Sequence, residues 1–244
     1  MVNPNKYLTN YLWKLIERYA NIKLYKKQLD IIDAWKGPHR IDTLNKGATF
    51  FNLVEKSFKR IMLLELCLFV SEKEDFNIYK WLEKVKLHSK SLKATRANKD
   101  NNSNNSRVSI KNNEYLKIID KHSSSLANHK KTINKLIALR EKIFTHYDSS
   151  YFNNPNAMFE KYSIDIFELD SLMNTIEDIL TEQHSYLFAS SITSFDVSSY
   201  SNIDMILLYT RAFMRIRGDK NLIIDKGFKP IDYLKELFPD SEKA

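Results

Sequence analysis

Apolar residues recur every three or four positions along most of the chain, which is the spacing of amphipathic helices. The first predicted helix begins at Pro4, a residue that suits a first helical turn, and continues to about residue 28. A helix over 50–70 is apolar on most sides after residue 61, which predicts a largely buried position. Further helices are predicted over residues 76–88, 115–120, 124–147, 167–192, 203–217 and 230–238. Because no alternating strand pattern or internal repeat competes with them, the sequence predicts an all-α fold.

Composition narrows the classes of function that this fold can carry. The chain has only 4 glycines, too scattered for a glycine-rich phosphate loop, and a single cysteine, Cys67. One cysteine excludes an intrachain disulfide and a cysteine-based zinc site, which is typical of a reducing cytoplasm. The longest apolar run, residues 61–70, contains Glu65 and is much shorter than the roughly 20 residues of a membrane-spanning helix. We therefore expect a cytoplasmic protein without a signal peptide or membrane segment.

The positive charge is concentrated in the middle of the chain. The whole sequence has 38 Lys and Arg against 30 Asp and Glu, a net charge of +8. Residues 80–131 hold 13 basic and 4 acidic side chains, whereas residues 132–244 hold 12 and 17. The basic part includes the Asn-, Ser- and Lys-rich segment 93–109, which we interpret as a flexible loop. It is either solvated surface or an arm that binds nucleic-acid phosphates.

Two charged residues occupy positions that should face the protein interior. Arg140 lies in the middle of an apolar stripe of the predicted helix 124–147, and Glu65 has apolar neighbours at helical spacing on the helix 50–70. A buried guanidinium stays charged and is costly without a partner. An ion pair between Glu65 and Arg140 is the economical structural interpretation. The functional alternative is a buried carboxylate that orients a catalytic arginine.

His146 follows Arg140 by six residues, about 120° away around an ideal helix. The two side chains can converge on one ligand if the helix ends near Thr145, or if the site combines residues of two protomers. Asp148 is placed to orient the imidazole. The structural alternative is an ordinary histidine at a helix C-terminus, where the helix dipole favours it.

The segment Leu139-Arg140-Glu141-Lys142-Ile143-Phe144-Thr145-His146-Tyr147-Asp148 resembles the Arg-x(4 to 6)-His signature of the HEPN superfamily, and is most similar to its abortive-infection branch. The region 51–85, with the acidic run Glu72-Lys73-Glu74-Asp75, and the helix 167–192 also resemble that branch. The resemblance covers roughly residues 45–195. It implies an antiparallel helical bundle of the HEPN type, to which the helical spacing outside this range adds N- and C-terminal helices. We expect an N-terminal extension over 1–44, the bundle over 45–195 and a C-terminal cap over 196–244.

The resemblance also implies a site and a reaction. Active HEPN proteins are ribonucleases that use no metal and cut RNA by attack of the ribose 2′-hydroxyl. Arg140 and His146 would be the catalytic residues, facing one cleft from both chains of a homodimer. We expect supporting roles for Glu65, Glu141 and Asp148, RNA contacts from Lys130, Lys131 and Lys142, and neither a cofactor nor a metal.

The sequence departs from the family pattern at two positions. Many nuclease members have Asn, Asp or His directly after the arginine, whereas this chain has Glu141, whose charge repels phosphate. Asp148 stands where a branch partnered by nucleotidyltransferase antitoxins has a tyrosine that is modified, so that modification is not expected here.

Three functions follow as alternatives. The first is a toxin-type or phage-defence ribonuclease, whose partners would be RNA and an antitoxin or another protein. The second is a non-catalytic HEPN module that binds RNA, a nucleotide or a protein. The third is a purely structural helical protein with a solvated basic surface.

Overall fold

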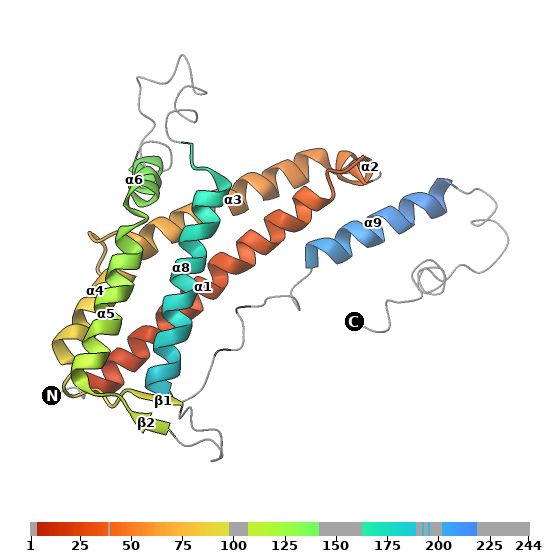
Figure 1. Ribbon diagram of the computed structural model, residues 1–244. Coiled ribbons are helices and arrows are strands. Elements are labelled where there is room, and N and C mark those ends of the chain that lie inside the picture. The colour runs from red at the N-terminus through yellow and green to blue at the C-terminus, as the bar shows by residue number, and fades with distance from the viewer. Residues whose placement is uncertain are drawn as a thin grey trace. The chain divides into compact units, whose positions relative to one another are not determined.

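The structure is a computed structural model that describes residues 4–38, 40–97, 107–141, 163–188, 192, 195 and 202–218. The described part is almost entirely helical, which confirms the predicted all-α class. Its helices are α1 (Pro4–Ala34), α2 (Ile41–Lys46), α3 (Ala48–Val70), α4 (Ile78–His88), α5 (Asn112–Ala127), α6 (Lys130–Leu139), α8 (Ile166–Phe188) and α9 (Asn202–Gly218) (Figure 1). The predicted helix 230–238 lies outside the described residues.

Contacts divide the chain into two compact units. The first contains residues 1–26 and 59–197, and the second contains residues 27–58 and 198–244. Helices α1 and α3 therefore contribute residues to both units. The three-part domain division expected from the sequence stays a prediction.

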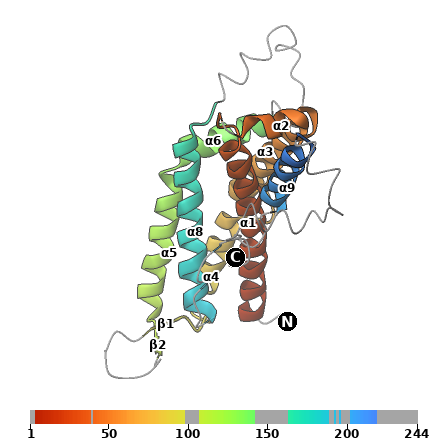
Figure 2. The ribbon, with the colours of Figure 1, turned by 90° about the vertical axis from the view of Figure 1, so that its right-hand side faces the viewer.

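The first unit is an antiparallel bundle. Helix α5 packs against both α8 and α4 (Figures 1 and 2). The N-terminal part of α1 runs antiparallel to α8, because Trp13 contacts Phe188 whereas Tyr19 donates a hydrogen bond of 2.6 Å to the carbonyl of Met173. The core between these helices includes the fully buried side chains Leu12, Leu15, Leu66, Phe69, Trp81, Leu172 and Ile176.

Helix α4 shows why the sequence pattern was informative. Asn77 caps its N-terminus, since its side chain accepts a hydrogen bond of 2.9 Å from the backbone N–H of Lys80. Ile78, Trp81 and Val85 recur at helical spacing and are buried. The indole N–H of Trp81 donates to the carbonyl of Leu8 in α1 at 3.2 Å, which fixes α4 against α1.

The prediction of one long helix over 124–147 is wrong at its beginning. Helix α5 starts at Asn112 and ends at Ala127, and α6 begins only at Lys130. The break falls at Asn128 and His129, and three consecutive serines, 123–125, stand in the last turns of α5 just before it. Ser and Asn favour helix ends because their side chains compete for backbone hydrogen bonds. His129 is held outside α5 by a hydrogen bond of 2.8 Å between its ring Nε2 and the hydroxyl of Thr175.

The basic segment 93–109 contains strands that the sequence did not indicate. Its two ends form an antiparallel ribbon of β1 (Thr95–Ala97) and β2 (Arg107–Ser109), in which Arg96 faces Val108. Arg107 anchors the ribbon to α8 by donating to the carbonyl of Ser185, and it donates to the carbonyl of Thr95 at 3.1 Å. A three-residue strand is too short for the alternation that identifies strands in a sequence.

The second unit has a small core of its own. Trp35, Leu44, Phe51 and Leu207 are buried together there. Lys36 bridges Asp33 at 2.7 Å and Glu55 at 2.8 Å, and the guanidinium of Arg40 lies 5.3 Å from the centre of the Trp35 ring.

Candidate functional site

Arg140 lies directly after α6, where the backbone changes to a wider π-type turn over Arg140 and Glu141. Leu136 and Leu139 in the last turn of α6 are buried at 1% and 7% exposure, so the end of this helix is anchored in the core. The side chain of Arg140 is 14% exposed. It is therefore at the edge of the bundle, mostly covered yet in contact with solvent. Turns of the π type occur often at functional sites.

The guanidinium of Arg140 faces two carboxylates. Its Nη1 donates a hydrogen bond of 2.6 Å to Oε1 of Glu74, and its Nη2 lies 3.8 Å from Oε1 of Glu141. Lys73 adds a second cation, 3.9 Å from the same Glu141 oxygen. These four side chains carry two positive and two negative charges. The formal charges of these four described side chains therefore cancel.

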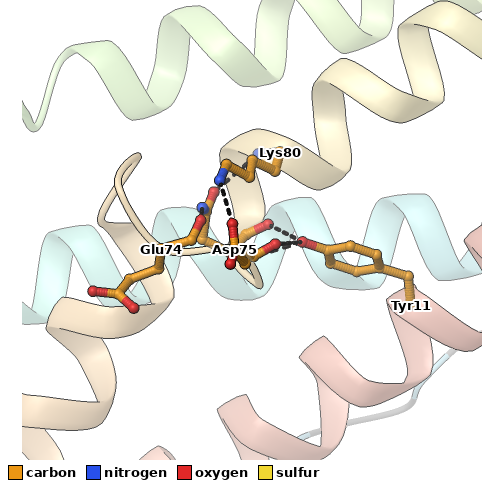
Figure 3. A network of polar contacts seen from close by, with 5 residues as sticks. Tyr11, Glu74, Asp75 and Lys80 are labelled. Atoms are coloured by element: carbon orange, nitrogen blue, oxygen red, sulfur yellow. Dashed lines mark hydrogen bonds and ion pairs between the residues drawn. The ribbon is translucent and has the colours of Figure 1, made fainter.

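The loop that carries Glu74 joins α3 to α4 and is closely hydrogen-bonded (Figure 3). The backbone N–H of Glu74 donates to the carbonyl of Ser71 at 3.1 Å, and the side-chain amide of Asn77 donates to the Glu74 carbonyl. Tyr11 in α1 accepts a hydrogen bond of 3.0 Å from the backbone N–H of Asn77. Lys80 and Asp75 form a further ion pair at 3.1 Å. The backbone at Glu74 is therefore held in place by contacts with both α1 and α4.

Cys67 is a buried thiol within the electrostatic reach of this cluster. Burial raises its pKa to about 11, the charge of Arg140 opposes that rise, and Glu74 and Glu141 add to it. The thiol is consequently protonated at neutral pH. A protonated, fully buried thiol is a poor nucleophile.

The expected ion pair between Glu65 and Arg140 is wrong. Glu65 instead accepts a hydrogen bond of 2.6 Å from Nε of Arg18 in α1, and its side chain is 34% exposed. Arg18 also donates to the carbonyl of Phe76 at 3.4 Å. The helical spacing predicted that both charges face the interior. Arg140 is mostly covered, whereas Glu65 is one-third exposed, and each pairs with a different partner: Glu65 with Arg18 of α1, and Arg140 with Glu74 of the α3–α4 loop.

The other residues expected at the site are only partly covered by the structure. His146, Asp148 and Lys142 lie outside the described residues. Lys130 is exposed, and Lys131 lies 4.0 Å from a Glu168 oxygen with 80% of its side chain exposed. Lys135, which the sequence reasoning missed, pairs with Glu168 more closely at 3.0 Å. Neither Lys130 nor Lys131 is buried, so both can reach a ligand at the surface.

A second polar cluster, between α5 and α8, was not predicted. The ring of His122 contacts Glu182 through Nε2 at 2.8 Å and Gln183 through Nδ1 at 3.1 Å. Tyr115 donates to Gln183 at 2.7 Å, and Tyr186 donates to Glu182 at 2.6 Å. His122 is only 3% exposed. Its helical spacing with Tyr115, Ile119 and Leu126 in the buried face of α5 could have indicated this position.

Burial and internal hydrogen bonds shift the pKa values of His122 and Glu182 in this cluster. Burial lowers the pKa of His122, although its contact with Glu182 opposes that effect. Burial raises the pKa of Glu182, but hydrogen bonds from Tyr186 and His122 outweigh it, so the net pKa shift is downward. The pair holds a neutral imidazole beside an ionised carboxylate at neutral pH. Because Tyr115, His122 and Gln183 are buried, their hydrogen bonds join α5 to α8 within the core.

No group of three or more His, Cys, Asp or Glu in the part of the chain that the structure describes is arranged to hold a metal ion. Within the same residues, no helix combines the length and the apolar character needed to cross a bilayer.

Comparison with known protein families gives a match that covers both the helical bundle and Arg140. The model of a HEPN family described as AbiU2 matches residues 8–205. The chain therefore belongs to this family and is a HEPN-type abortive-infection protein. Its particular family within the HEPN class is AbiU2. The match begins at residue 8 and so includes most of α1, upstream of residue 45 where the sequence resemblance began. No curated protein and no solved structure gave a significant match.

Proposed function

We propose that this protein is a metal-independent endoribonuclease of the toxin or phage-defence type. The observation that carries the proposal is the position of Arg140 within the family match: it follows the buried last turn of α6, its side chain is 14% exposed, and a hydrogen bond holds it. An arginine at the edge of a core provides the planar donor group that binds a phosphate.

The reaction follows from the chemistry of RNA and of these two residue types. A base removes the proton of the ribose 2′-hydroxyl, and the 2′-oxygen forms a bond to the adjacent phosphorus. The bond from phosphorus to the 5′-oxygen breaks, and that oxygen takes up a proton. The products are a 2′,3′-cyclic phosphate and a 5′-hydroxyl end. His146 is the proposed acid or base because an imidazole titrates near neutral pH, and Arg140 stabilises the charge that grows on the phosphate.

The experiment is incubation of the purified protein with total RNA in EDTA, followed by mapping of the fragment ends. We expect cleavage by the wild type, with cyclic-phosphate ends, and none by Arg140→Ala or His146→Ala. His88→Ala is the matched control, because His88 ends α4, apart from the proposed site. Intact RNA with folded wild-type protein would refute the proposal, as would equal cleavage by wild type and His146→Ala.

We further propose that the active form is a homodimer whose cleft takes Arg140 and His146 from both chains. Mixing inactive Arg140→Ala and His146→Ala proteins then restores part of the activity if one chain's arginine works with the partner's histidine. Size-exclusion chromatography with light scattering measures the oligomeric state directly. An antitoxin or another protein that silences the enzyme is the expected further partner.

A second function is favoured by the neutral charge of the Arg140 cluster. With Glu74 and Glu141 both beside the guanidinium, the site attracts phosphate weakly, as in a non-catalytic module that binds RNA or a protein. Binding of a 2′-O-methyl RNA, which cannot be cut by 2′-oxygen attack, separates the two. Arg140-dependent binding without cleavage of ordinary RNA would favour the non-catalytic module.

A further inference from the structure

Glu74 in the loop between α3 and α4 contacts the arginine directly. Its carboxylate accepts from Nη1 of Arg140 at 2.6 Å, across 66 positions of sequence. Glu141 is also near, but its 3.8 Å separation from Nη2 is too long for a hydrogen bond. The two carboxylates therefore differ in kind: Glu74 sets the direction of the guanidinium, and Glu141 contributes charge.

Glu74 is itself held in place from two sides. In Figure 3 the Tyr11 ring reaches the loop from α1, while the carboxylate of Glu74 extends away from that contact. Tyr11 is 5% exposed, and its hydroxyl donates to the carbonyl of Asn77 at 3.1 Å as well as accepting from the Asn77 N–H. Asn77 in turn donates to the Glu74 carbonyl and caps α4. The contacts thus form a continuous path from Tyr11 to Arg140.

A long, flexible side chain acts efficiently on a transition state only if its geometry is set beforehand, because misplacement by about 1 Å can cost on the order of 100-fold in rate. The backbone of Arg140 is anchored by the buried last turn of α6, but that does not fix the far end of a long side chain. A carboxylate on a closely hydrogen-bonded loop constrains the guanidinium itself.

We propose that Glu74 is a positioning residue, which fixes the guanidinium of Arg140 for contact with the scissile phosphate. This inference rests on the proposed ribonuclease function. It assigns the α3–α4 loop a role in the site, and it makes Tyr11 in α1 a supporting residue for the same arginine.

Kinetics of the Glu74→Gln variant separate positioning from simple charge. Removing a negative charge beside a phosphate site lowers repulsion, so a purely electrostatic role predicts a lower KM and no loss of kcat. Positioning predicts that kcat on a defined RNA falls by about 10- to 100-fold while KM does not rise. Glu74→Asp keeps the charge on a side chain shorter by one methylene, and we expect it to recover part of kcat.

Two matched controls test the specificity of this effect. Glu72→Gln removes the same charge from an exposed position of the same loop and is expected to retain wild-type kcat. Tyr11→Phe removes the hydroxyl that holds Asn77 and is expected to lower kcat in the same direction as Glu74→Gln, by a smaller factor. Tyr7→Phe, at a 44% exposed neighbour on α1, is expected to have no such effect.

A second measurement reports on Arg140 without RNA. The Nε–Hε group of Arg140 gives an NMR signal that is assigned by its loss in Arg140→Lys. We expect Glu74→Gln to shift this signal toward that of a free arginine and to speed its exchange with water, and Glu72→Gln to leave it unchanged. An unchanged signal in Glu74→Gln would overturn the proposal, and so would a shifted signal with wild-type kcat. If the wild type cuts no RNA, the proposed function fails, and the NMR comparison still decides whether Glu74 positions Arg140.

Discussion

Nη1 of Arg140 lies 2.6 Å from Oε1 of Glu74, and this hydrogen bond joins the end of α6 to the loop between α3 and α4. Side-chain exposure of 14% for the arginine and 35% for the glutamate places the pair at the edge of the bundle. Each partner can therefore be hydrated if the other is removed, unlike the members of a fully buried ion pair.

Replacement of Arg140 by alanine should cost more in activity than in stability. Because Glu74 can turn to water, we expect the free energy of unfolding to fall by about 1–2 kcal/mol, less than the 3–5 kcal/mol of a broken buried pair. Cleavage should fall by about 100- to 1000-fold, as for the loss of one transition-state donor. Thermal melts and RNA cleavage on the same samples measure both. A loss of about 4 kcal/mol in the free energy of unfolding would instead indicate that Arg140 has a mainly structural role.

The pairing of Glu65 with Arg18 can be measured by a double-mutant cycle. We expect Arg18→Met and Glu65→Gln to show a coupling free energy of about 1 kcal/mol in unfolding experiments, since their hydrogen bond of 2.6 Å is partly shielded from water. The same cycle with Glu65→Gln and Arg140→Met should be additive within about 0.5 kcal/mol. A larger coupling free energy for the second pair would support the ion pair between Glu65 and Arg140 that the sequence predicted.

Tyr115 should contribute to stability through its hydroxyl. In Tyr115→Phe, the oxygen of Gln183 loses its donor at a position that is 0% exposed, so we expect a loss of about 1–3 kcal/mol in the free energy of unfolding. Tyr209→Phe, at a 52% exposed side chain of α9, is the control and should change stability by less than about 0.5 kcal/mol. Urea denaturation measures both. Equal midpoints for the two variants would contradict the importance of this hydrogen bond.

The burial of His122 predicts loss of stability in mild acid. Its folded pKa is below the ordinary value of 6.5, so the unfolded chain binds the proton more tightly and stability falls as the pH drops below about 6.5. Glu182 affects stability in a more acidic range. Its folded pKa is below 4.5, so its contribution to stability is present above that value and is lost as the pH falls through the folded pKa. Between pH 6.5 and 5, His122 therefore determines how the stability contributed by this pair changes with pH.

Unfolding measured from pH 7.5 to 5 in wild type and His122→Gln checks this expectation. The variant should show a flatter pH dependence, whatever its absolute stability. The comparison variant is His129→Gln, because burial also lowers the pKa of His129, which is less enclosed. Parallel curves for wild type and His122→Gln would show that His122 does not determine the acid response.

Local patterns were sufficient to predict most of the helices. Ranges for α3, α4, α8 and α9 were predicted within a few residues, because the side chains that each helix buries recur along its own sequence. The mostly covered position of Arg140 and the HEPN resemblance came from the same kind of local evidence. The α5–α6 break and the short β-ribbon were missed, since both depend on contacts with α8: His129 with Thr175, and Arg107 with Ser185.

Spacing and composition along the chain are therefore sufficient to predict the all-α class, the main helices and the family to which the chain belongs. Which charges pair with one another depends instead on how distant segments pack together. Glu65, Glu72, Glu74 and Asp75 are similar candidates for Arg140 as sequence positions, and their helical or loop spacing carries no information about the partner. The choice is made by the α3–α4 loop, which Tyr11 and Asn77 hold in one conformation, so that one carboxylate of the acidic run reaches the guanidinium. Such a pairing depends on the relative placement of three separate elements, and no local pattern encodes it.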